Sequence, residues 1–497
     1  MEKKYIIALD AGTTSNRAII FDRDLNIAGI SQKEFKQIYP GPGWVEHDAD
    51  EIWRTQYSVL KEVFEKYNVA PSEIAALGIT NQRETTVIWD RKSGRPVTNA
   101  IVWQDRRTAG YCESLKANGY SDLIRQKTGL VIDSYFSGTK IKWILDNIEG
   151  VREQAENGEL AFGTVETWLV WNLTGGKLHI TDVSNASRTM LFNIHTLKWD
   201  RELLDLMDIP EALLPEVVDS SEVYGTVQRK VLAGDVPVSG LAGDQQASLF
   251  GQLCHAPGMV KNTYGTGCFV MMNTGNKPDL SSEKLVATIA WKTGDEIRYA
   301  VEGSIFIGGS LIKWLRDNLK IVNSSSEIEG LAGQVNDNGG IVIVPAFAGL
   351  GAPHWDQFAR GTIFGITGAT TGAHIARAAL EAIALQVKDV IYEMISGTGI
   401  GIKQLRVDGG ASVDNLLMQL QADLSDCEVV RPRITETTAL GAALLAGLSV
   451  GFWKNYDDIR KRWKTDRVFK PDKSVDNSKI LKYWNKALAR TKNWIED

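Results

Sequence analysis

Cysteine and histidine are scarce in this sequence, and neither forms a recognisable ligand or disulfide pattern. The 497 residues include four cysteines and six histidines. Neither set shows metal-ligand spacing or clustering, which argues against a zinc site and gives no sign of a disulfide framework. We therefore expect reduced thiols in a cytoplasmic protein. The cysteines are Cys112, Cys254, Cys268 and Cys427.

Basic residues are not in excess, and long hydrophobic runs are absent. Lys and Arg number 55 against 61 Asp and Glu, so the formal net charge is −6. A duplex nucleic acid partner needs a basic stripe, and this balance argues against one. No run approaches the roughly 20 apolar residues of a membrane span. The apolar run after Met1 is too short and too early for a secretory signal. We expect no nucleic acid partner and no membrane span.

The length and the segment pattern indicate an α/β protein with two domains. A chain of 497 residues is too long for one hydrophobic core. Helix-like and strand-like segments alternate along it. The spacing predicts strands over 74–80 and 85–89, and helices over 52–67 (capped by Asp48 or Asp50), 137–147 and 166–173.

The most informative segment lies near the N-terminus. Two apolar runs flank a Gly/Thr/Ser turn that lies between Asp10 and Arg17. The runs predict a hairpin of buried strands. Such a turn offers backbone N–H groups and hydroxyls to an anion, with a guanidinium beside it, so it is suited to hold phosphate. A solvated hairpin turn is the alternative interpretation.

A second segment past the middle of the chain repeats this pattern. Residues 258–274 again read as strand, Gly/Thr turn and strand, with the turn at 265–267. The similarity suggests a duplicated domain in which each half supplies one turn. Two apposed turns could grip a polyphosphate from both sides. Chance similarity of two hairpins is the alternative.

Charged residues stand at the ends of two further predicted strands. Arg83 and Glu84 are adjacent, and adjacent residues of an extended chain point to opposite sides. Both reach one ligand only if the chain bends there; an exposed ion pair is the alternative. Asp244 follows an apolar strand, where it either caps a helix or accepts a proton from a substrate hydroxyl, since ligands bind at the carboxyl ends of such strands.

Paired glycines and aromatic residues complete the candidate sites. Gly409–Gly410 lets a flat ligand such as a nucleoside lie against the backbone, and Gly308–Gly309 could form the facing wall. A small polyol needs acids that accept hydrogen bonds, Arg or Gln that donate them, and an aromatic wall for its carbons. The polar set is Arg83, Glu84, Tyr135, Asp244 and Gln245, and the aromatic candidates, which ordinary core packing also explains, are Trp103 and Phe269.

These motifs together are recognisable. The chain resembles the FGGY family of carbohydrate kinases over nearly its whole length. Within that family, the Arg83–Glu84 and Asp244–Gln245 segments narrow the expected substrate to glycerol. The resemblance is carried by residues 10–15, 80–86, 100–108, 135–147, 242–246, 264–267, 349–356, 361–381 and 407–410.

The resemblance implies an α/β fold of two duplicated ribonuclease-H-like (actin-like ATPase) domains flanking a catalytic cleft. The expected division is an N-terminal FGGY domain, 1–248, for glycerol and the phosphates, and a C-terminal FGGY domain, 249–497, for the nucleotide. The stretch from about residue 453 is rich in Lys, Asp and Trp and reads as a helical appendage. Because the family forms dimers and tetramers, the resemblance also implies a homodimer or homotetramer.

The implied activity is transfer of the γ-phosphoryl group of Mg·ATP to a terminal hydroxyl of glycerol, giving sn-glycerol 3-phosphate. By resemblance, Asp244 is the general base and Asp10 orients the Mg²⁺ shell through water. The expected glycerol contacts are Arg83, Glu84, Trp103, Tyr135, Asp244, Gln245 and Phe269. The expected nucleotide contacts are Thr13, Thr14, Ser15, Arg17, Thr266, Gly309, Lys313, Gly410 and Asp414.

A few positions depart from the family pattern. Asp414 stands where Asn is usual, and Lys313 where Gln is often found. Residues 220–225 and 226–236 lack the histidine and the loop that some bacterial members use for regulation. Two other functions remain open. One is a kinase of another polyol or a pentulose, which needs a roomier pocket than Trp103 and Phe269 suggest; the other is an actin-like ATPase, which needs no polyol-binding set.

Overall fold

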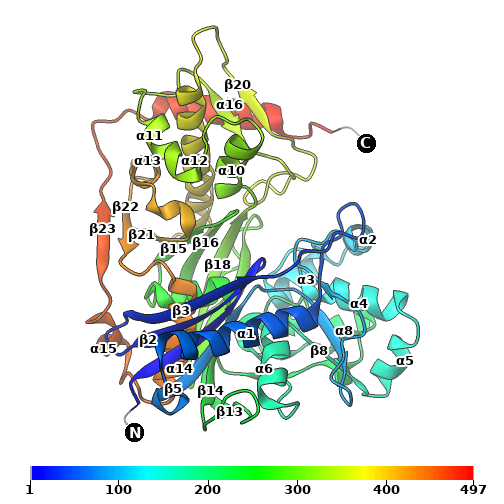
Figure 1. The fold of residues 1–497 in the computed structure, drawn as a ribbon. Coiled ribbons are helices and arrows are strands. Elements are labelled where there is room, and N and C mark those ends of the chain that lie inside the picture. The colour runs from blue at the N-terminus through cyan, green and yellow to red at the C-terminus, as the bar shows by residue number, and fades with distance from the viewer. Residues whose placement is uncertain (1–2, 496–497) are drawn as a thin grey trace.

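The computed structural model describes residues 3–495, which form two α/β halves (Figure 1). We call the residues up to the end of α9 the N-terminal half and the residues after it the C-terminal half. The helices are α1 (Ala49–Tyr67), α2 (Ala109–Ala117), α3 (Ser121–Thr128), α4 (Ser137–Asn147), α5 (Val151–Glu156), α6 (Val165–Thr174), α7 (Val183–Ala186), α8 (Arg201–Met207), α9 (Asp244–Gly251), α10 (Gly309–Asp317), α11 (Ile328–Ala332), α12 (Gly372–Thr398), α13 (Asn415–Ser425), α14 (Thr437–Ser449), α15 (Tyr456–Arg460) and α16 (Ser478–Thr491). Short 3₁₀ turns are η1 (Pro71–Glu73), η2 (Glu211–Leu213), η3 (Ser325–Glu327) and η4 (Gly410–Val413).

The strands divide between the halves as the helices do. Those of the N-terminal half are β1 (Tyr5–Ala11), β2 (Ser15–Asp22), β3 (Ile27–Glu34), β4 (Glu46–His47), β5 (Ile74–Asn81), β6 (Val87–Asp90), β7 (Ala100–Ile101), β8 (Leu160–Gly163), β9 (Ile180–Asp182), β10 (Phe192–Asn193), β11 (Lys198–Trp199), β12 (Glu216–Val218), β13 (Ser221–Thr226) and β14 (Pro237–Gly243). Those of the C-terminal half are β15 (Val260–Tyr264), β16 (Cys268–Gly275), β17 (Val286–Thr293), β18 (Glu296–Ile305), β19 (Val342–Val344), β20 (Thr362–Phe364), β21 (Gln404–Asp408), β22 (Glu428–Pro432) and β23 (Thr465–Phe469).

The main sheet of the N-terminal half has β1 near its centre. Its order is β13-β14-β5-β1-β2-β3. β1 pairs antiparallel with β2 and parallel with β5, which in turn pairs parallel with β14. The predicted hairpin is therefore confirmed. Its turn and the ends of β5 and β14 lie at the same edge of the sheet, because parallel strands bring their carboxyl ends together.

The main sheet of the C-terminal half repeats this scheme. Its order is β17-β18-β16-β15-β21-β22-β23. β15 pairs antiparallel with β16 and parallel with β21, and β21 pairs parallel with β22. β15, β16, β21 and β22 thus correspond to β1, β2, β5 and β14. The predicted second hairpin and the suggested duplication agree with this topology, and each half places one Gly/Thr turn after its central strand.

The predicted helices form for local reasons that the structure makes visible. α1 begins after Asp48, whose Oδ1 accepts hydrogen bonds from the N–H groups of Asp50 and Glu51 at 2.9 and 3.2 Å. It ends at Asn68, which has left-handed backbone angles. Its apolar face packs on β2 and β3. α4 and α6 also lie where the spacing predicted helices.

Two helices cross between the halves and join them. α9 follows β14 of the first sheet but also packs against β15 and β16 of the second, while α14 packs on β14, β5 and β1. The two helices pack closely where they cross. A Cβ atom added at Gly441 of α14 would lie 1.8 Å from the carbonyl oxygen of Ala247 of α9. Only glycine allows this approach.

The crossing gives a stability prediction. Gly441→Ala should lower the free energy of unfolding by about 3 kcal/mol, the upper end of the range for overpacking, because backbone atoms rather than a flexible side chain block the new methyl group. Gly110→Ala is the matched control: Gly110 lies in α2, and a Cβ atom there would meet no atom of the described residues within 4 Å. It should change stability by less than about 1 kcal/mol. Chemical denaturation of both variants measures the difference, and equal stability would show that α9 and α14 can separate freely.

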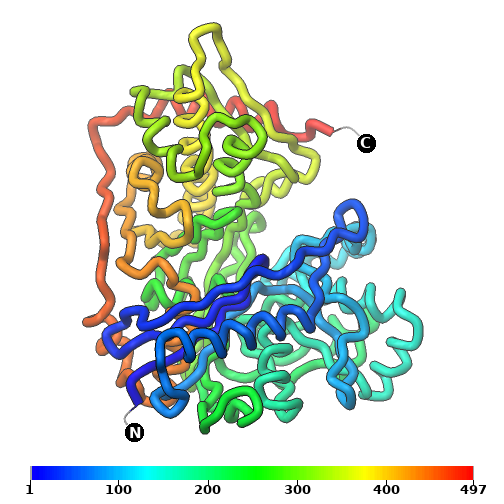
Figure 2. Tube along the Cα trace, in the orientation of Figure 1, coloured from blue at the N-terminus to red at the C-terminus, as the bar shows by residue number. Residues whose placement is uncertain are grey.

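The C-terminal stretch differs from the expected helical appendage. β23 pairs antiparallel with β22 and completes the second sheet. Figure 2 shows the last segment running along one side of the molecule to the far end of the C-terminal half. Trp453 and Trp484 are fully buried, and their indole N–H groups donate to the Arg23 carbonyl oxygen and to Asp389 Oδ2. The tail is therefore part of the packed structure of both halves.

The four cysteine side chains lie in the interior of the protein. Cys112, Cys254, Cys268 and Cys427 are all free and buried, and burial raises the pKa of each thiol to about 12. Between residues 3 and 495 no helix is both long and apolar enough to cross a membrane.

Candidate functional site

The turn between β1 and β2 presents free hydrogen-bond donors. Thr13 is partly exposed and Thr14 is exposed. Among the described residues, no acceptor lies within hydrogen-bond distance of the backbone N–H of Thr13 or Thr14. Ser15 is buried, and its hydroxyl oxygen accepts a hydrogen bond from Gln32 Nε2 at 3.1 Å, which leaves its hydrogen free to donate. Adjacent free donors of this kind form an anion-binding turn.

Arg17 links this turn to the C-terminal half. It lies opposite Asp10 in the β1–β2 register, with Nη1 3.8 Å from Asp10 Oδ2. The same Nη1 donates to Glu436 Oε2, just before α14, at 2.6 Å. A phosphate at the turn would therefore compete with Glu436 for this guanidinium.

The carboxylate of Asp10 suits a magnesium ion. Burial raises the pKa of Asp10 to about 6, against Arg17 and with a further contribution from Glu436 and Asp244. A divalent cation would reverse this tendency toward protonation. Within residues 3–495, no group of three or more His, Cys, Asp or Glu side chains could form a metal cage. The single carboxylate of Asp10 beside the turn instead fits Mg²⁺, which binds through one or two carboxylates together with phosphate oxygens and water.

The chain bends at Glu84, as joint binding by Arg83 and Glu84 requires. The φ of Glu84 is +59°, in the left-handed region that non-glycine residues seldom adopt. Both residues are buried, and Arg83 Nε lies 3.7 Å from Glu84 Oε1. The alternative of an exposed ion pair is therefore wrong. A strained backbone angle at a buried charge is typical of functional sites.

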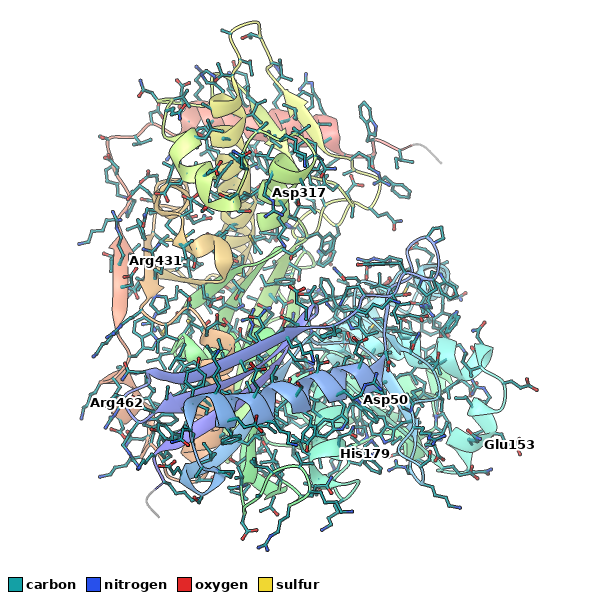
Figure 3. The ribbon with its side chains drawn as sticks, viewed as in Figure 1. Asp50, Glu153, His179, Asp317, Arg431 and Arg462 are labelled. Atoms are coloured by element: carbon teal, nitrogen blue, oxygen red, sulfur yellow. The ribbon has the colours of Figure 1, made fainter. Side chains whose placement is uncertain are left out.

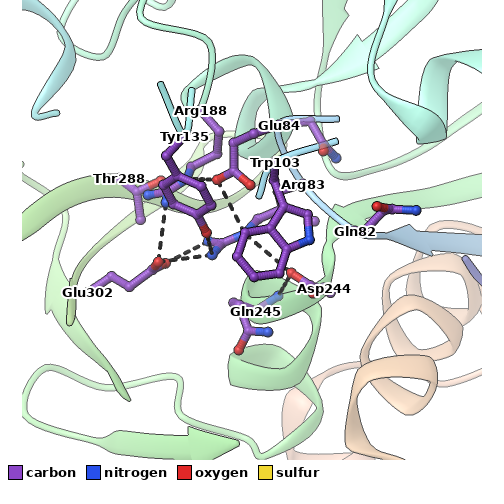
Figure 4. Close-up of polar contacts among 12 residues, drawn as sticks. Gln82, Arg83, Glu84, Trp103, Tyr135, Arg188, Asp244, Gln245, Thr288 and Glu302 are labelled. Carbon is purple, nitrogen blue, oxygen red and sulfur yellow. Dashed lines mark hydrogen bonds and ion pairs between the residues drawn. The ribbon is translucent and has the colours of Figure 1, made fainter. Parts of the chain in front are cut away.

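Arg83 is held by a carboxylate from the other half of the chain. Its Nη1 and Nη2 donate to Glu302 Oε2 and Oε1 at 2.6 and 2.9 Å, a bidentate pair. Arg188 donates to Glu84 at 2.7 Å and to Glu302 at 3.2 Å (Figure 4). Burial opposes the charge of Glu302, but Arg188 and Arg83 lower its pKa to about 2. We call Arg83, Glu84, Arg188 and Glu302 the Arg–Glu cluster.

Asp244 lies beside this cluster and is open to a ligand. It is the first residue of α9, and Gly243 occupies the capping position, so the capping interpretation is wrong. Asp244 Oδ1 lies 3.2 Å from Arg83 Nε, and 30% of its side chain is exposed. Burial raises the pKa of this carboxyl, although Arg83 and Lys261 oppose the shift. A partly open carboxylate of raised basicity can accept a proton from a hydroxyl.

Gln245, the next residue, is fixed by a lysine. Its Oε1 accepts a hydrogen bond from Lys261 Nζ, while its amide nitrogen has no acceptor in the described part of the chain. Lys261 is fully buried on β15, and burial lowers its pKa to about 8 against the carboxylates of Asp408 and Asp244. The lysine orients the amide so that its N–H groups remain available to a ligand oxygen.

The predicted aromatic wall is assembled from both halves. The ring centroid of Trp103 lies 5.6 Å from that of Tyr135 and 6.3 Å from that of Phe269. Trp103 Nε1 also donates to Thr13 Oγ1 at 3.0 Å, which joins the wall to the first turn. Tyr135 accepts a hydrogen bond from Arg83 Nη2 at 3.2 Å. All three rings are only partly exposed, and Figure 4 shows Trp103 and Tyr135 beside Arg83.

Residues predicted to contact the nucleotide meet around the second turn. The N–H of Gly309, the first residue of α10, donates to the Gly265 carbonyl oxygen at 2.9 Å. A Cβ atom at Gly409 would lie 2.6 Å from the Tyr264 carbonyl oxygen, so this glycine allows β21 to approach the turn. Thr266 and Gly410 are exposed on the surface thus formed.

Lys313 lies on α10, the helix that begins at Gly309, and Asp414 lies between η4 and α13. Asp414 Oδ1 caps α13 by accepting from the Leu417 N–H at 2.8 Å, and its buried Oδ2 has no hydrogen-bond partner among residues 3–495. Burial raises the pKa of Asp414 to about 6. Lys313 is exposed on α10. Their predicted nucleotide contacts stay predictions.

Comparison with known proteins decides the family. The model for the N-terminal domain of the FGGY family of carbohydrate kinases matches residues 5–251, and the model for the C-terminal domain matches residues 260–450. The chain belongs to the FGGY family of carbohydrate kinases. The predicted family and its two-domain, actin-like α/β fold are confirmed.

Members of the family with known names are similar over the whole chain. Proteins named glycerol kinase from Burkholderia vietnamiensis and Chromobacterium violaceum are each 59% identical over 498 residues, covering 100% of both chains. A crystal structure of Plasmodium falciparum glycerol kinase with ADP is 36% identical, with a TM-score of 0.91 over 100% of this chain and 99% of that one. A xylulose kinase from Lactobacillus acidophilus, 22% identical with a TM-score of 0.87 over 98% and 99%, shares the fold.

Three further residues of the site were not predicted from the sequence. Arg188, Lys261 and Glu302 are fully buried and touch the predicted glycerol contacts. The available signal was a charged residue inside an apolar strand, as in Val260-Lys261 and Val301-Glu302, because buried charges are rare unless they are paired. Arg188 carries no such signal, since it follows the polar segment 184–187.

Proposed function

We propose that this protein transfers the γ-phosphoryl group of ATP to a terminal hydroxyl of glycerol, giving sn-glycerol 3-phosphate. The observation that carries the proposal is the junction of the two halves. There, Arg83, Glu84 and Asp244 lie together beside the aromatic wall. Trp103 of that wall donates a hydrogen bond to Thr13 in the turn between β1 and β2, which is suited to hold phosphate. The full-length similarity to proteins named glycerol kinase supports the same substrate.

The polar residues account for a three-carbon polyol. Glu84 and Asp244 accept hydrogen bonds from hydroxyl groups, while Arg83 and Gln245 donate to their oxygens. Trp103, with the rings beside it, packs against the carbons. Because the Arg–Glu cluster fixes Arg83 before the ligand arrives, little side-chain entropy is lost on binding.

Asp244 is the proposed general base. Its carboxylate takes the proton of the attacking hydroxyl, while the γ-phosphoryl group moves from the ADP leaving group to that oxygen. Donors at Thr13, Thr14 and Ser15, together with Arg17, stabilise the negative charge on the phosphate oxygens. Asp10 would hold Mg²⁺ through water, and the ion would supply neutralising charge for the phosphates.

On the nucleotide side, the second turn at Thr266 and the surface formed by Gly309 and Gly410 would hold the rest of the ATP molecule. Lys313 and Asp414 would lie at its edge. Catalysis in this reaction depends mainly on alignment and charge neutralisation. A site in which one half binds the acceptor and the other half binds most of the nucleotide provides that alignment. Closure of the two halves would exclude water.

A coupled assay for ADP release tests the proposal. With Mg²⁺ and ATP present, added glycerol should raise ADP release by at least about 100-fold over the rate without it, since bound water is a poorly positioned acceptor. Product analysis should find sn-glycerol 3-phosphate in equal amount. ADP release that ignores glycerol would instead support an actin-like ATPase.

A substrate panel separates glycerol from larger acceptors. Xylulose and ribulose should turn over more slowly than glycerol, because these longer acceptors need more room than the bulky Trp103 and Phe269 rings, with centroids 6.3 Å apart, suggest. Faster turnover of a pentulose would overturn the substrate assignment but not the reaction. Homodimer or homotetramer formation and a cytoplasmic location remain predictions that light scattering and cell fractionation can test.

A further inference from the structure

His47 is a buried polar group that the proposed mechanism does not use. It lies on β4 with no exposed surface, and its ring meets Phe35 edge-on at 5.0 Å. Burial lowers its pKa to about 4, so the ring is neutral at neutral pH. Both ring nitrogens have partners, and both partners are glutamines: Nε2 lies 2.8 Å from Gln37 Oε1, and Nδ1 lies 3.4 Å from Gln82 Nε2.

The two glutamines connect His47 to the turn between β1 and β2. Gln37 Nε2 donates to the Thr13 carbonyl oxygen at 3.0 Å. Gln82 Nε2 donates to the Gly12 carbonyl oxygen at 3.1 Å. Two consecutive carbonyl groups of the turn are thus held by two amides, and one imidazole stands between those amides.

Only one arrangement of hydrogens satisfies this set. Gln37 Oε1 is an acceptor, so His47 Nε2 carries the hydrogen and donates it. Nδ1 of the neutral ring is then an acceptor for the Gln82 amide. Thr85 Oγ1 donates to Gln82 Oε1 at 2.9 Å, which fixes the orientation of that amide from the other side. Each side chain thereby fixes the orientation of the next.

Because the two glutamines hold these carbonyl groups, they also fix the direction of the N–H groups in the same two peptides. In a planar trans peptide the N–H points opposite to the C=O. The Gly12 carbonyl shares its peptide with the Thr13 N–H, and the Thr13 carbonyl shares its peptide with the Thr14 N–H. These two N–H groups have no acceptor in the described part of the chain, and they point away from the glutamines.

We propose that His47 is a positioning residue which, through Gln37 and Gln82, sets the two peptide planes that present the Thr13 and Thr14 N–H groups to the nucleotide phosphates. This inference rests on the proposed function, since it assigns the phosphates to that turn. Buried imidazole nitrogens need hydrogen-bond partners in any case; what distinguishes His47 is that both of its partners are amides that hold carbonyl groups of the turn. Its two hydrogen-bond partners are neither predicted glycerol contacts nor the predicted base, so we expect its effect to fall mainly on the nucleotide.

The test replaces the ring nitrogens but keeps the ring. His47→Phe should raise the dissociation constant for ADP, measured by calorimetry on the full-length protein, by roughly ten-fold or more, because charge-assisted hydrogen bonds to phosphate are misdirected. The KM for ATP should rise in parallel, while the KM for glycerol stays within about two-fold. His47→Gln, which keeps an N–H near the Nε2 position, should recover part of the loss.

His179 supplies a matched control. It lies in the same half (Figure 3), and its ring meets Trp89 edge-on at 5.5 Å. Within the described part of the chain its Nε2 bonds only to the Phe162 carbonyl oxygen, and burial lowers its pKa to about 4 as well. His179→Phe should lower stability without changing nucleotide binding. Equal ADP affinities for the two phenylalanine variants would overturn the proposal and leave His47 a packing residue.

A second variant keeps the test decisive if His47→Phe folds poorly. Gln37→Leu removes the hydrogen bonds that connect His47 to the Thr13 carbonyl group, and it should raise the ADP dissociation constant to a similar extent. If the residues act as one unit, the double variant with His47→Gln should be no worse than Gln37→Leu alone, whereas full additivity would contradict the relay. Because calorimetry with ADP needs no glycerol turnover, failure of the inference can be told from failure of the proposed function.

Discussion

Asp244→Asn is expected to lower kcat for glycerol phosphorylation by a factor of about 10²–10⁴, the usual contribution of a general base. The amide keeps the size of the carboxylate but cannot take the hydroxyl proton. Asp244 faces the open part of the site with 30% of its side chain exposed, so the substitution leaves no buried cavity. The ADP dissociation constant should stay within about two-fold, since the residue does not contact the phosphate turn.

The pH profile gives a second measurement of the same role. A base works only when deprotonated, so kcat/KM should fall as the pH drops through the pKa of Asp244. Burial raises that pKa above its ordinary 3.8. The acid limb of the wild-type profile should therefore lie at a higher pH than an exposed aspartate would give, and activity should rise with pH through that limb. Asp244→Asn should remove this limb from whatever activity remains.

Gln245→Asn serves as the matched control for Asp244→Asn. It changes the neighbouring residue of α9 and shortens a glycerol contact without touching the base. We expect it to raise the KM for glycerol and to leave kcat within about ten-fold of the wild type. If Asp244→Asn behaved like this control, with near-normal turnover at saturating glycerol, Asp244 would be a binding residue and the base would have to be found elsewhere.

The sequence was sufficient to predict elements whose formation depends on local pattern. The β1–β2 hairpin, α1 with its Asp48 cap and α4 formed as expected, because apolar periodicity and capping residues act over short distances. The second hairpin was visible for the same reason. Residues in recognisable turns and strand ends, such as Arg83 and Asp244, could be singled out although their partners could not.

Partners from distant parts of the chain could not be predicted in the same way. Glu302 meets Arg83 across 219 positions, and Arg188 meets Glu302 across 114. No periodicity connects such residues; only the packing of one half against the other brings them together. His47 was overlooked because a single histidine carries no pattern, and its role depends on two glutamines that the fold places around it.

The prediction that the C-terminal stretch is a helical appendage was wrong for a related physical reason. β23 has mainly exposed side chains, so it lacks the apolar alternation by which strands are recognised. It is a strand because it pairs antiparallel with β22, whose backbone N–H and C=O groups on that side would otherwise be unpaired. Edge strands with polar faces are therefore missed by pattern alone.

Glu302→Gln is expected to have the largest effect on stability. The substitution keeps the volume of the side chain but leaves the guanidinium groups of Arg83 and Arg188 in a fully buried site with Glu84 as their one remaining partner in the Arg–Glu cluster. Breaking a buried ion pair from one side costs about 3–5 kcal/mol. We expect a loss of that size in the free energy of unfolding, together with a raised KM for glycerol, because Arg83 loses its bidentate support.

Two further variants test whether charge or packing causes this loss. Asp205→Asn removes one carboxylate from an exposed pair with Arg201, whose side chains are 61% and 74% exposed, and should change stability by less than about 1 kcal/mol. Combining Glu302→Gln with Arg188→Met removes one charge of each sign, so the double variant should be more stable than the sum of the single losses predicts. If Glu302→Gln were as mild as Asp205→Asn, the cluster would be screened by water, and Arg83 would not be fixed before glycerol binds.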